Sequence, residues 1–250
     1  RDRQNSEIEG IDIMLAIDVS TSMLAEDLKP NRLEAAKDVA AEFINGRPND
    51  NIGITLFAGE TFTQCPLTVD HAVLLDMIHN IKCGLITDGT AVGMGIANAV
   101  TRLKDSKAKS KVIILLTDGT NNKGDISPMT AAEIAKSFGI RVYTIGVGTN
   151  GMAPYPYPVG NTVQYVSMPV EIDEKTLTEI AGTTDGNYFR ATSNSKLKEV
   201  YEEIDKLEKT KLNVKEYSKR DEEYHWFALA AFLCVLLEVL LRNSVLKKIP

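Results

Sequence analysis

Runs of apolar residues recur along the chain and predict a sheet of buried strands. The first run lies within Ile11 to Ser22, IDIMLAIDVSTS, where residues 13–17 lack the alternation of a half-exposed strand. Val112 to Leu116, VIILL, is a second continuous run, and Ile140 to Val147 and Asn187 to Ala191 are expected to be further strands. Continuous apolar strands are typical of parallel sheets that helices cover on both faces.

Segments with helical spacing of apolar residues alternate with these strands. The spacing predicts helices at Arg32–Ile44, from Asp70 to about Ile81, and at Ala91–Leu103, Ala131–Phe138, Asp173–Ala181 and Ser195–Leu212. The charged residues of the last helix are expected to form a solvated face. Ile52–Ala58 and Thr61–Leu67 are strands split by Gly59-Glu60, the spacing of a hairpin. The fold class is therefore a doubly wound, mostly parallel α/β sheet with one antiparallel edge strand.

The first two apolar runs both lead into an acidic residue. Asp18 is followed by Ser20 and Ser22, and the second run ends at Thr117-Asp118-Gly119. Residues at the carboxyl ends of central parallel strands face the crevice where open α/β sheets bind ligands. Carboxylate and hydroxyl oxygens suit a hard cation such as Mg²⁺. The alternative is an ordinary strand end, with a Ser that caps the next helix.

Thr87-Asp88-Gly89-Thr90 lies between these two strands and precedes an expected helix. Two strands that end in Asp, with a Thr at a helix start between them, resemble the von Willebrand factor A domain. The resemblance implies a metal-ion-dependent adhesion site (MIDAS) for Mg²⁺, or for Mn²⁺ or Ca²⁺. It implies the ligands Asp18, Ser20, Ser22, Thr90 and Asp118. Thr87 is a weaker candidate for the Thr role, and Asp88 is expected to be a turn residue.

Composition and further motifs narrow the function. The 250 residues suffice for one large core with an appendage, and a net charge of −6 argues against nucleic acid as the main partner. Cys65, Cys83 and Cys234 lack metal-binding spacing; buried free thiols are expected, with a Cys65–Cys83 bridge as the alternative. Residues 146–151 match GxGxxG, but prolines follow where a dinucleotide site requires a helix, which excludes that interpretation.

A proline- and tyrosine-rich insertion, Ala153 to Glu171, follows that motif, with one strand expected at Thr162–Val166. Met152, Tyr155 and Tyr157 lie on a proline-stiffened segment that could add apolar contact to a partner at little ordering cost. The alternative is a loop that only covers a sheet edge.

The C-terminal segment differs from the rest of the chain in its long run without charged residues. Trp226 to Leu237 contains no charged residue, and Glu238 is followed by three further apolar residues. This pattern predicts a transmembrane helix at 224–242, with aromatic residues near one end. The expected organisation is a lead-in at 1–10, an A domain at 11–212, a polar linker at 213–223, the membrane helix and a cytoplasmic tail at 243–250. Charges on the two sides of the helix do not decide its orientation.

Several longer stretches resemble the BatA family of Bacteroides-aerotolerance membrane proteins. They are FAGETFTQCPLT, SKAKSKVIILLTDG, RVYTIGVGTNGMAPYP, EIDKLEKTK and the ending LRNSVLKKIP. The resemblance implies a protein of the bacterial inner membrane with its A domain in the periplasm. It also implies sibling Bat proteins and a MoxR-type AAA+ ATPase as partners.

The sequence thus predicts a metal-dependent protein-binding module of a cell-envelope complex in aerotolerance or stress resistance, and not an enzyme. A partner Asp or Glu carboxylate would complete the metal's coordination. One alternative is a metal-dependent hydrolase. Against it, Asp18 is followed by Ser20 rather than a second acid, and His71, His79 and His225 are expected away from the crevice. The other alternative is a structural scaffold with no metal role.

Overall fold

The computed structural model describes residues 10–160 and 162–218, together with residues 229, 231 and 235. The chain forms two compact units, Arg1–Glu208 and Lys209–Pro250. The first unit contains the sheet and the candidate site.

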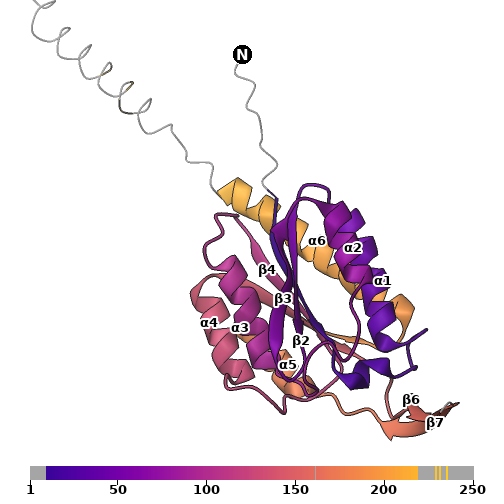
Figure 1. The fold of residues 1–250 in the computed structure, drawn as a ribbon. Coiled ribbons are helices and arrows are strands. Elements are labelled where there is room, and N and C mark those ends of the chain that lie inside the picture. The colour runs from indigo at the N-terminus through magenta and orange to yellow at the C-terminus, as the bar shows by residue number, and fades with distance from the viewer. Residues whose placement is uncertain (1–9, 161, 219–228, 230, 232–234, 236–250) are drawn as a thin grey trace, which may run out of the picture. The chain divides into compact units, whose positions relative to one another are not determined.

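A six-stranded sheet forms the centre of the first unit, in the order β3-β2-β1-β4-β5-β8 (Figure 1). Its neighbours are parallel except β2 and β3, which are antiparallel. The strands are β1 (Asp12–Asp18), β2 (Asn51–Phe57), β3 (Thr61–Thr68), β4 (Lys111–Thr117), β5 (Ile140–Val147) and β8 (Tyr188–Ala191). The predicted mostly parallel sheet with an antiparallel edge strand is confirmed.

Helices cover both faces of this sheet: Figure 1 shows α1, α2 and α6 on one face and α3, α4 and α5 on the other. They are α1 (Arg32–Asn45), α2 (His71–His79), α3 (Val92–Leu103), α4 (Pro128–Ser137), α5 (Glu174–Thr183) and α6 (Asn194–Ser218), and a short 3₁₀ helix, η1 (Thr21–Leu24), follows β1. Asp70 and Asp173, where two of the predicted helices start, cap α2 and α5, because each carboxylate accepts a hydrogen bond from a backbone N–H of the first turn.

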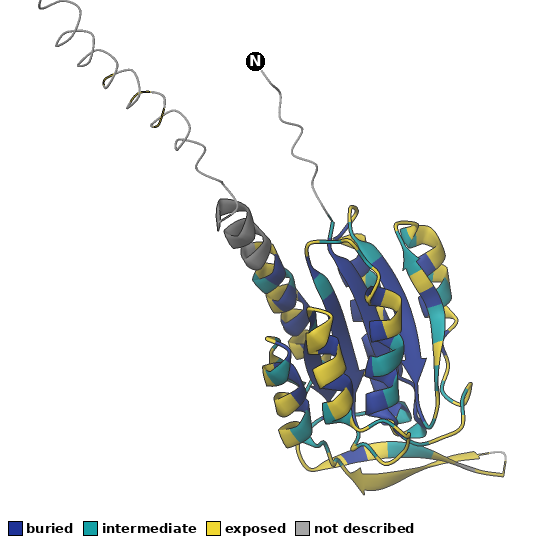
Figure 2. Cartoon of the chain, turned by 90° about the vertical axis from the view of Figure 1, so that its left-hand side faces the viewer, coloured by how far each residue is buried: buried dark blue, intermediate teal, exposed yellow. Residues whose placement is uncertain are grey.

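The core lies along the central strands. Every residue of β1 is buried, and β2 and β4 are buried from their second residue onward (Figure 2). Helix α3 comes very close to the sheet at Gly95, where an added Cβ would lie 2.7 Å from the Phe57 ring. This close packing fixes the start of α3, and therefore Thr90 just before it, at the edge of the sheet.

The insertion after β5 differs from the predicted loop with one strand. β6 (Met152–Val159) and β7 (Thr162–Pro169) form a separate two-stranded antiparallel sheet, here called the hairpin. In an antiparallel pair, alternate residues turn their backbone groups away from the partner strand, so prolines at alternate positions cost no ladder bond. The carbonyl of Pro154 accepts a hydrogen bond from Glu26 N at 2.8 Å, which shows this outward orientation. In the sequence, the prolines at alternate positions of residues 154–158 are the pattern that indicates strand β6.

Other expectations are confirmed or shifted by a few residues. Cys65 and Cys83 are free thiols, buried and half-buried respectively, and Cys234 lies outside the described residues. The GxGxxG motif is followed by strand β6 and not by a helix. Helix α4 begins at Pro128 rather than Ala131, because Ser127 caps it.

The last helix is longer and less solvated than expected. It continues to Ser218, into the predicted linker 213–223. Glu208 does not belong to a solvated face: the residue is 1% exposed and its carboxylate accepts hydrogen bonds from Tyr143 and Ser110. The helical period places Glu208 on the same face as the buried Tyr201 and Ile204, but it does not show which groups an acid on that face will meet.

Among the described residues, no helix is both long and apolar enough to cross a membrane. The predicted membrane helix at 224–242 lies outside the described residues apart from 229, 231 and 235, and the predicted tail at 243–250 lies wholly outside them. Both stay predictions.

A chain that ends at Ser218 is expected to fold, because the unit Arg1–Glu208 contains the sheet and its core. Thermal unfolding followed by circular dichroism should show one cooperative transition. Loss of that transition on truncation would mean that the removed residues belong to the core of the domain.

Candidate metal site

The candidate site lies where the strand order changes direction. From β1 the chain passes to β2 on one side and later reaches β4 on the other. β1 and β4 are parallel and in register, with Ile17 opposite Leu116. Their carboxyl ends therefore bring Asp18 and Asp118 to the same edge, at the position where open α/β sheets bind ligands.

Asp18 is fully buried and held at both oxygens. Its Oδ1 accepts a hydrogen bond from Ser20 N at 2.9 Å, and its Oδ2 accepts one from Thr117 Oγ1 at 2.6 Å. Burial, and secondly the negative charge of Asp118, raise the pKa of Asp18 to about 7 despite these hydrogen bonds. A bound divalent cation would offset both unfavourable effects.

The two serine hydroxyls connect this carboxylate to the second one. Ser22 Oγ donates to Asp118 Oδ1 at 2.7 Å, and the hydroxyls of Ser20 and Ser22 are 3.0 Å apart. In an octahedral Mg²⁺ site with metal–oxygen distances of about 2.0–2.1 Å, neighbouring ligand oxygens are about 2.9 Å apart. These hydrogen-bonded oxygens are therefore also close enough together to be neighbouring ligands of one cation.

Thr90 completes the set from a third segment. It is 4% exposed, and its side chain lies against Gly119, where an added Cβ would be 3.3 Å from Thr90 Oγ1. Asn122 fixes the Thr90 backbone, accepting from Thr90 N at 2.9 Å and donating its own N–H to Thr90 O at 3.0 Å. Thr90 thus lies beside the turn that carries Asp118.

Thr87 and Asp88, which precede Thr90 in the same loop, form hydrogen bonds with residues other than the candidate ligands. Thr87 Oγ1 donates to Glu60 at 3.4 Å. The exposed Asp88 carboxylate accepts hydrogen bonds from the backbone N–H and the hydroxyl of Thr21, at 3.0 and 2.8 Å. Asp88 therefore ties the loop before α3 to η1, in keeping with the turn role expected of it.

The donor set fits a hard cation of the MIDAS type. In the part of the chain that the structure describes, no group of three or more His, Cys, Asp or Glu side chains is placed to hold a metal. The candidate site combines two carboxylates with hydroxyls instead, and such all-oxygen donors suit Mg²⁺, which retains water where protein ligands are lacking.

Sequence reasoning missed Arg32, the first residue of α1. Its side chain is 4% exposed and donates from Nη1 to Asp118 Oδ2 at 2.6 Å. Its Nε and Nη2 both donate to the carboxylate of Asp27, at 2.7 and 2.6 Å. A cation in the first turn opposes the helix dipole, so an Arg at this position was a signal of a specific acidic partner.

Asp27 extends this connection to the loop before the hairpin. Its Oδ2 accepts from Thr149 N at 2.8 Å and from Thr149 Oγ1 at 3.2 Å. Gly148 allows the approach: its φ is +141°, and an added Cβ would lie 2.9 Å from Arg32 Nη2. A chain of charged hydrogen bonds thus joins Asp118 to the base of the hairpin.

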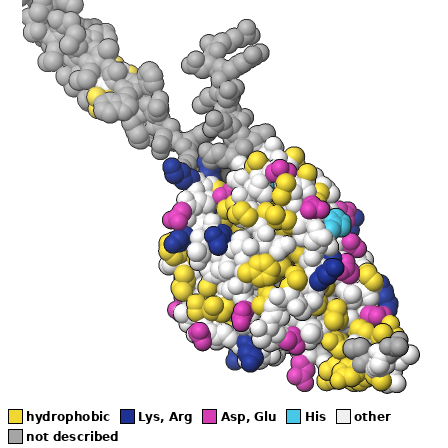
Figure 3. All heavy atoms as spheres, in the orientation of Figure 1, with side chains coloured by type: hydrophobic (Ala, Val, Ile, Leu, Met, Phe, Trp, Pro, Cys, Tyr) yellow, Lys and Arg dark blue, Asp and Glu magenta, His cyan; other side chains and the backbone are white. Residues whose placement is uncertain are grey.

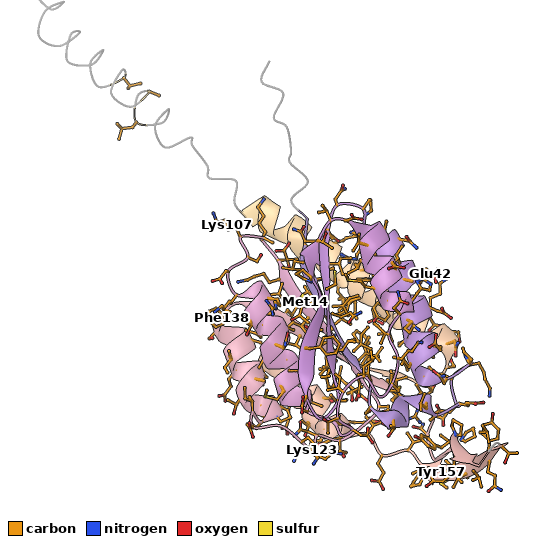
Figure 4. All side chains as sticks on the ribbon, in the orientation of Figure 1. Met14, Glu42, Lys107, Lys123, Phe138 and Tyr157 are labelled. Atoms are coloured by element: carbon orange, nitrogen blue, oxygen red, sulfur yellow. The ribbon has the colours of Figure 1, made fainter. Side chains whose placement is uncertain are left out.

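A cavity of about 270 Å³ lies between the candidate site and the hairpin. One wall contains Thr21, Ser22 and Arg32, and the other contains residues of β6 and β7, among them Tyr155, Tyr157 and Met168. Figure 4 shows Tyr157 on the hairpin at the end of the domain far from Lys107.

A second cavity of about 300 Å³ lies between α1 and α6, lined in part by Phe43, Arg47 and Tyr201. Arg47 precedes the amino end of β2, so this cavity lies at the other end of the sheet from Asp18. It is slightly larger but contains none of the predicted site residues.

The model of the von Willebrand factor type A domain matches residues 12–203, and the chain belongs to this family. BatB from Bacteroides thetaiotaomicron is 34% identical with a TM-score of 0.70, and the match covers 80% of this chain and 100% of that one. An aerotolerance-related membrane protein from Bacteroides fragilis is 32% identical with a TM-score of 0.70, over 79% and 98% of the two chains. The predicted resemblance to Bacteroides-aerotolerance proteins is confirmed.

Two further relatives show how much of a related protein this chain spans and that a related domain binds a metal ion. The chain is 32% identical over 203 residues to a UPF0353 protein of Mycolicibacterium paratuberculosis, and the match covers 76% of the chain and 58% of that protein. The chain thus spans less than two thirds of that relative. Proximal thread matrix protein 1 of the mussel byssus is 25% identical with a TM-score of 0.62, over 79% and 45% of the two chains, and its structure has a zinc-occupied MIDAS motif.

Proposed function

We propose that this domain is a metal-dependent protein-binding module, in which Asp18, Ser20, Ser22, Thr90 and Asp118 hold Mg²⁺ or a similar divalent cation. The observation that carries the proposal is the meeting of these oxygens, from three separate segments, at the carboxyl edge of β1 and β4. A zinc-occupied MIDAS motif in a relative supports a divalent metal in this family.

When bound, the cation supplies a positive centre with a coordination position that a partner's Asp or Glu carboxylate can enter. The protein's own residues prepare that position. Thr117 and the Ser20 amide orient Asp18, and Arg32 holds the outer oxygen of Asp118 so that Oδ1 faces Ser22. Since these groups are already in place, little side-chain ordering opposes binding.

Binding is proposed rather than catalysis because of where the described histidines lie. His71 Nε2 is hydrogen-bonded to the carbonyl of Asp50 and His79 Nδ1 to that of Leu75, so each ring bonds to a backbone group and not to a candidate ligand. His225 lies outside the described residues. A metal-dependent hydrolase would need a base close to the metal.

The setting proposed for this module is a cell-envelope complex that contributes to aerotolerance or stress resistance. The aerotolerance-related membrane protein among the relatives supports this setting. Within it, we propose an inner-membrane location with the A domain in the periplasm. Sibling Bat proteins and a MoxR-type AAA+ ATPase are the proposed partners.

Thr90→Ala is expected to weaken capture of partner proteins from a bacterial envelope extract at least tenfold in Mg²⁺, because it removes one metal ligand. EDTA should reduce wild-type capture to the same level. Capture is measured by quantitative pull-down on immobilised protein.

Thr87→Ala is the matched control, because this neighbouring hydroxyl bonds to Glu60 instead. It should capture partners as the wild type does. Equal capture by wild type and Thr90→Ala, unaffected by EDTA, would favour the structural scaffold with no metal role.

A further inference from the structure

The hairpin differs in chemistry from the rest of the domain. Residues 151–170 contain no charged side chain, although 25% of the whole chain is charged. β7 is exposed along its length, and Tyr157 and Met168 are 57% and 48% exposed. Figure 3 shows hydrophobic side chains gathered at this end of the molecule. Exposed apolar surface of this extent, next to a charged site, is typical of a protein-interaction surface.

The hairpin is also tied to Glu26, in the segment that follows η1. Glu26 anchors it twice: its N–H donates to Pro154 O at 2.8 Å, and its carboxylate accepts from Tyr165 OH at 3.1 Å. The base is closed by the bond from Val170 N to Gly151 O, at 2.8 Å. A surface fixed in this way loses little conformational entropy when a partner binds.

The cavity between the candidate site and the hairpin is large enough to admit an amino-acid side chain. Ligand pockets for small molecules usually measure about 300–1,000 Å³, whereas this one measures about 270 Å³. Its Ser22 wall belongs to the candidate metal site, and Tyr155, Tyr157 and Met168 form an apolar wall opposite. A carboxylate at the metal and an apolar group in the cavity would therefore be neighbours.

We propose that the partner segment carries an Asp or Glu with an aliphatic side chain within two positions of it. The acid would enter the metal's open position, and the aliphatic group would fill the cavity under the hairpin. Residues of an extended chain advance by about 3.3–3.6 Å each, so two adjoining spaces select near neighbours in sequence. This proposal rests on the proposed function and adds the chemistry of its partner.

Charge sets the role of the metal in this recognition. Without a cation, Asp18 and Asp118 form a negative site that repels an acidic segment, and Arg32 is already paired with two carboxylates. A divalent cation reverses this repulsion, whereas the apolar wall formed by Tyr155, Tyr157 and Met168 contains no candidate metal ligand. The two contributions can therefore be separated by experiment.

The probes are immobilised peptides of the form Gly-Ser-Ser-Glu-Ser-Ser-Gly, in which Leu replaces Ser at each of the four positions within two residues of the Glu. Parallel peptides carry Gln in place of Glu. Binding of the full chain is measured by biolayer interferometry in Mg²⁺ and in EDTA. At least one Glu–Leu peptide should bind about tenfold more tightly than the Glu–Ser peptide in Mg²⁺, and Gln peptides or EDTA should abolish binding.

A pair of variants tests the cavity itself. Met168→Gln keeps the shape of the side chain but makes the cavity wall polar, and should remove most of the gain from Leu while leaving Glu–Ser binding unchanged. Val163→Thr makes a similar change at a 57% exposed site on the same strand. Because residues of opposite parity face opposite sides of a strand, this control should retain the gain.

The outcomes distinguish the two proposals. Equal binding of the Glu–Leu and Glu–Ser peptides, dependent on Mg²⁺, would overturn the cavity inference and leave the proposed function standing. A gain from Leu that Met168→Gln and Val163→Thr reduce equally would overturn it as well. Absence of Mg²⁺-dependent binding to any Glu peptide would contradict both.

Discussion

Asp118→Ala is expected to abolish the binding of Mg²⁺ and Mn²⁺ that isothermal titration calorimetry detects with the wild-type protein. The carboxylate ends β4, bonds to Ser22 Oγ and lies beside Asp18, so its loss removes an acid and misplaces a hydroxyl together. The far-ultraviolet circular dichroism spectrum should be nearly unchanged, since Arg32 keeps both hydrogen bonds to Asp27.

Asp88→Ala is the matched control for this variant. Asp88 is an exposed carboxylate in the loop that precedes Thr90, and it bonds to Thr21 rather than to the five candidate ligands. We expect its metal affinity to stay within about threefold of the wild-type value, which corresponds to less than about 0.7 kcal/mol. If Asp118→Ala retained wild-type affinity, the metal site would lie elsewhere.

Glu208→Ala is expected to lower the free energy of unfolding by about 3 kcal/mol, the lower part of the range for breaking a buried ion pair. The side chain of Glu208 is 1% exposed and pairs with Arg141, and its carboxylate also accepts from Tyr143 OH at 2.6 Å and from Ser110 Oγ at 2.9 Å. Its removal leaves those groups without this partner, and denaturant unfolding measures the loss.

The pH dependence of stability gives a second test of Glu208. Burial alone would raise the pKa of this carboxyl, but the hydrogen bond from Tyr143 and the charge of Arg141 outweigh burial and lower it. A lowered folded-state pKa stabilises the protein above the ordinary value of about 4.3, and that stabilisation is lost as the pH falls below it. The gap in stability between wild type and Glu208→Ala should therefore be full at pH 7 and narrow below about pH 4.

Glu203→Ala, an exposed position on the same helix, is the control for both measurements. Exposed substitutions usually change stability by less than about 0.5 kcal/mol. A similar loss from both variants, constant with pH, would mean that helix propensity and not the buried carboxylate is responsible.

Much of the architecture was predictable because its signals are local. Continuous apolar runs identified β1 and β4, helical periodicity identified the covering helices, and two of those helices were predicted to start at Asp70 and Asp173. The candidate ligands also occupy positions that local signals define, although their assignment as a set came from the resemblance to the von Willebrand factor A domain. They follow strand ends or precede a helix, and the topology of a parallel sheet brings such positions to one edge.

Three features were decided only by the tertiary structure. Arg32 bonds to Asp118, 86 residues away, and Asp27 accepts from Thr149, 122 residues away. Glu208 meets Tyr143 across 65 residues. It lies four residues after the buried Ile204, on the buried face of α6, but the helical period does not show which group an acid at that position will meet. In the hairpin, prolines that suggest a loop form a strand, and the carbonyl of Pro154 bonds to Glu26 rather than to β7.

One physical cause explains why some features were predictable from the sequence and others were not. The sequence by itself determined which segments are apolar and where strands and helices end, because those properties depend on residues a few positions apart. The pairing of a buried charge depends instead on which distant group the completed fold places within about 3 Å, in surroundings where an unpaired charge is costly. That is why the strands, the helices and the strand ends beside the candidate site could be predicted from the sequence, whereas the charged link from the site to the hairpin could not.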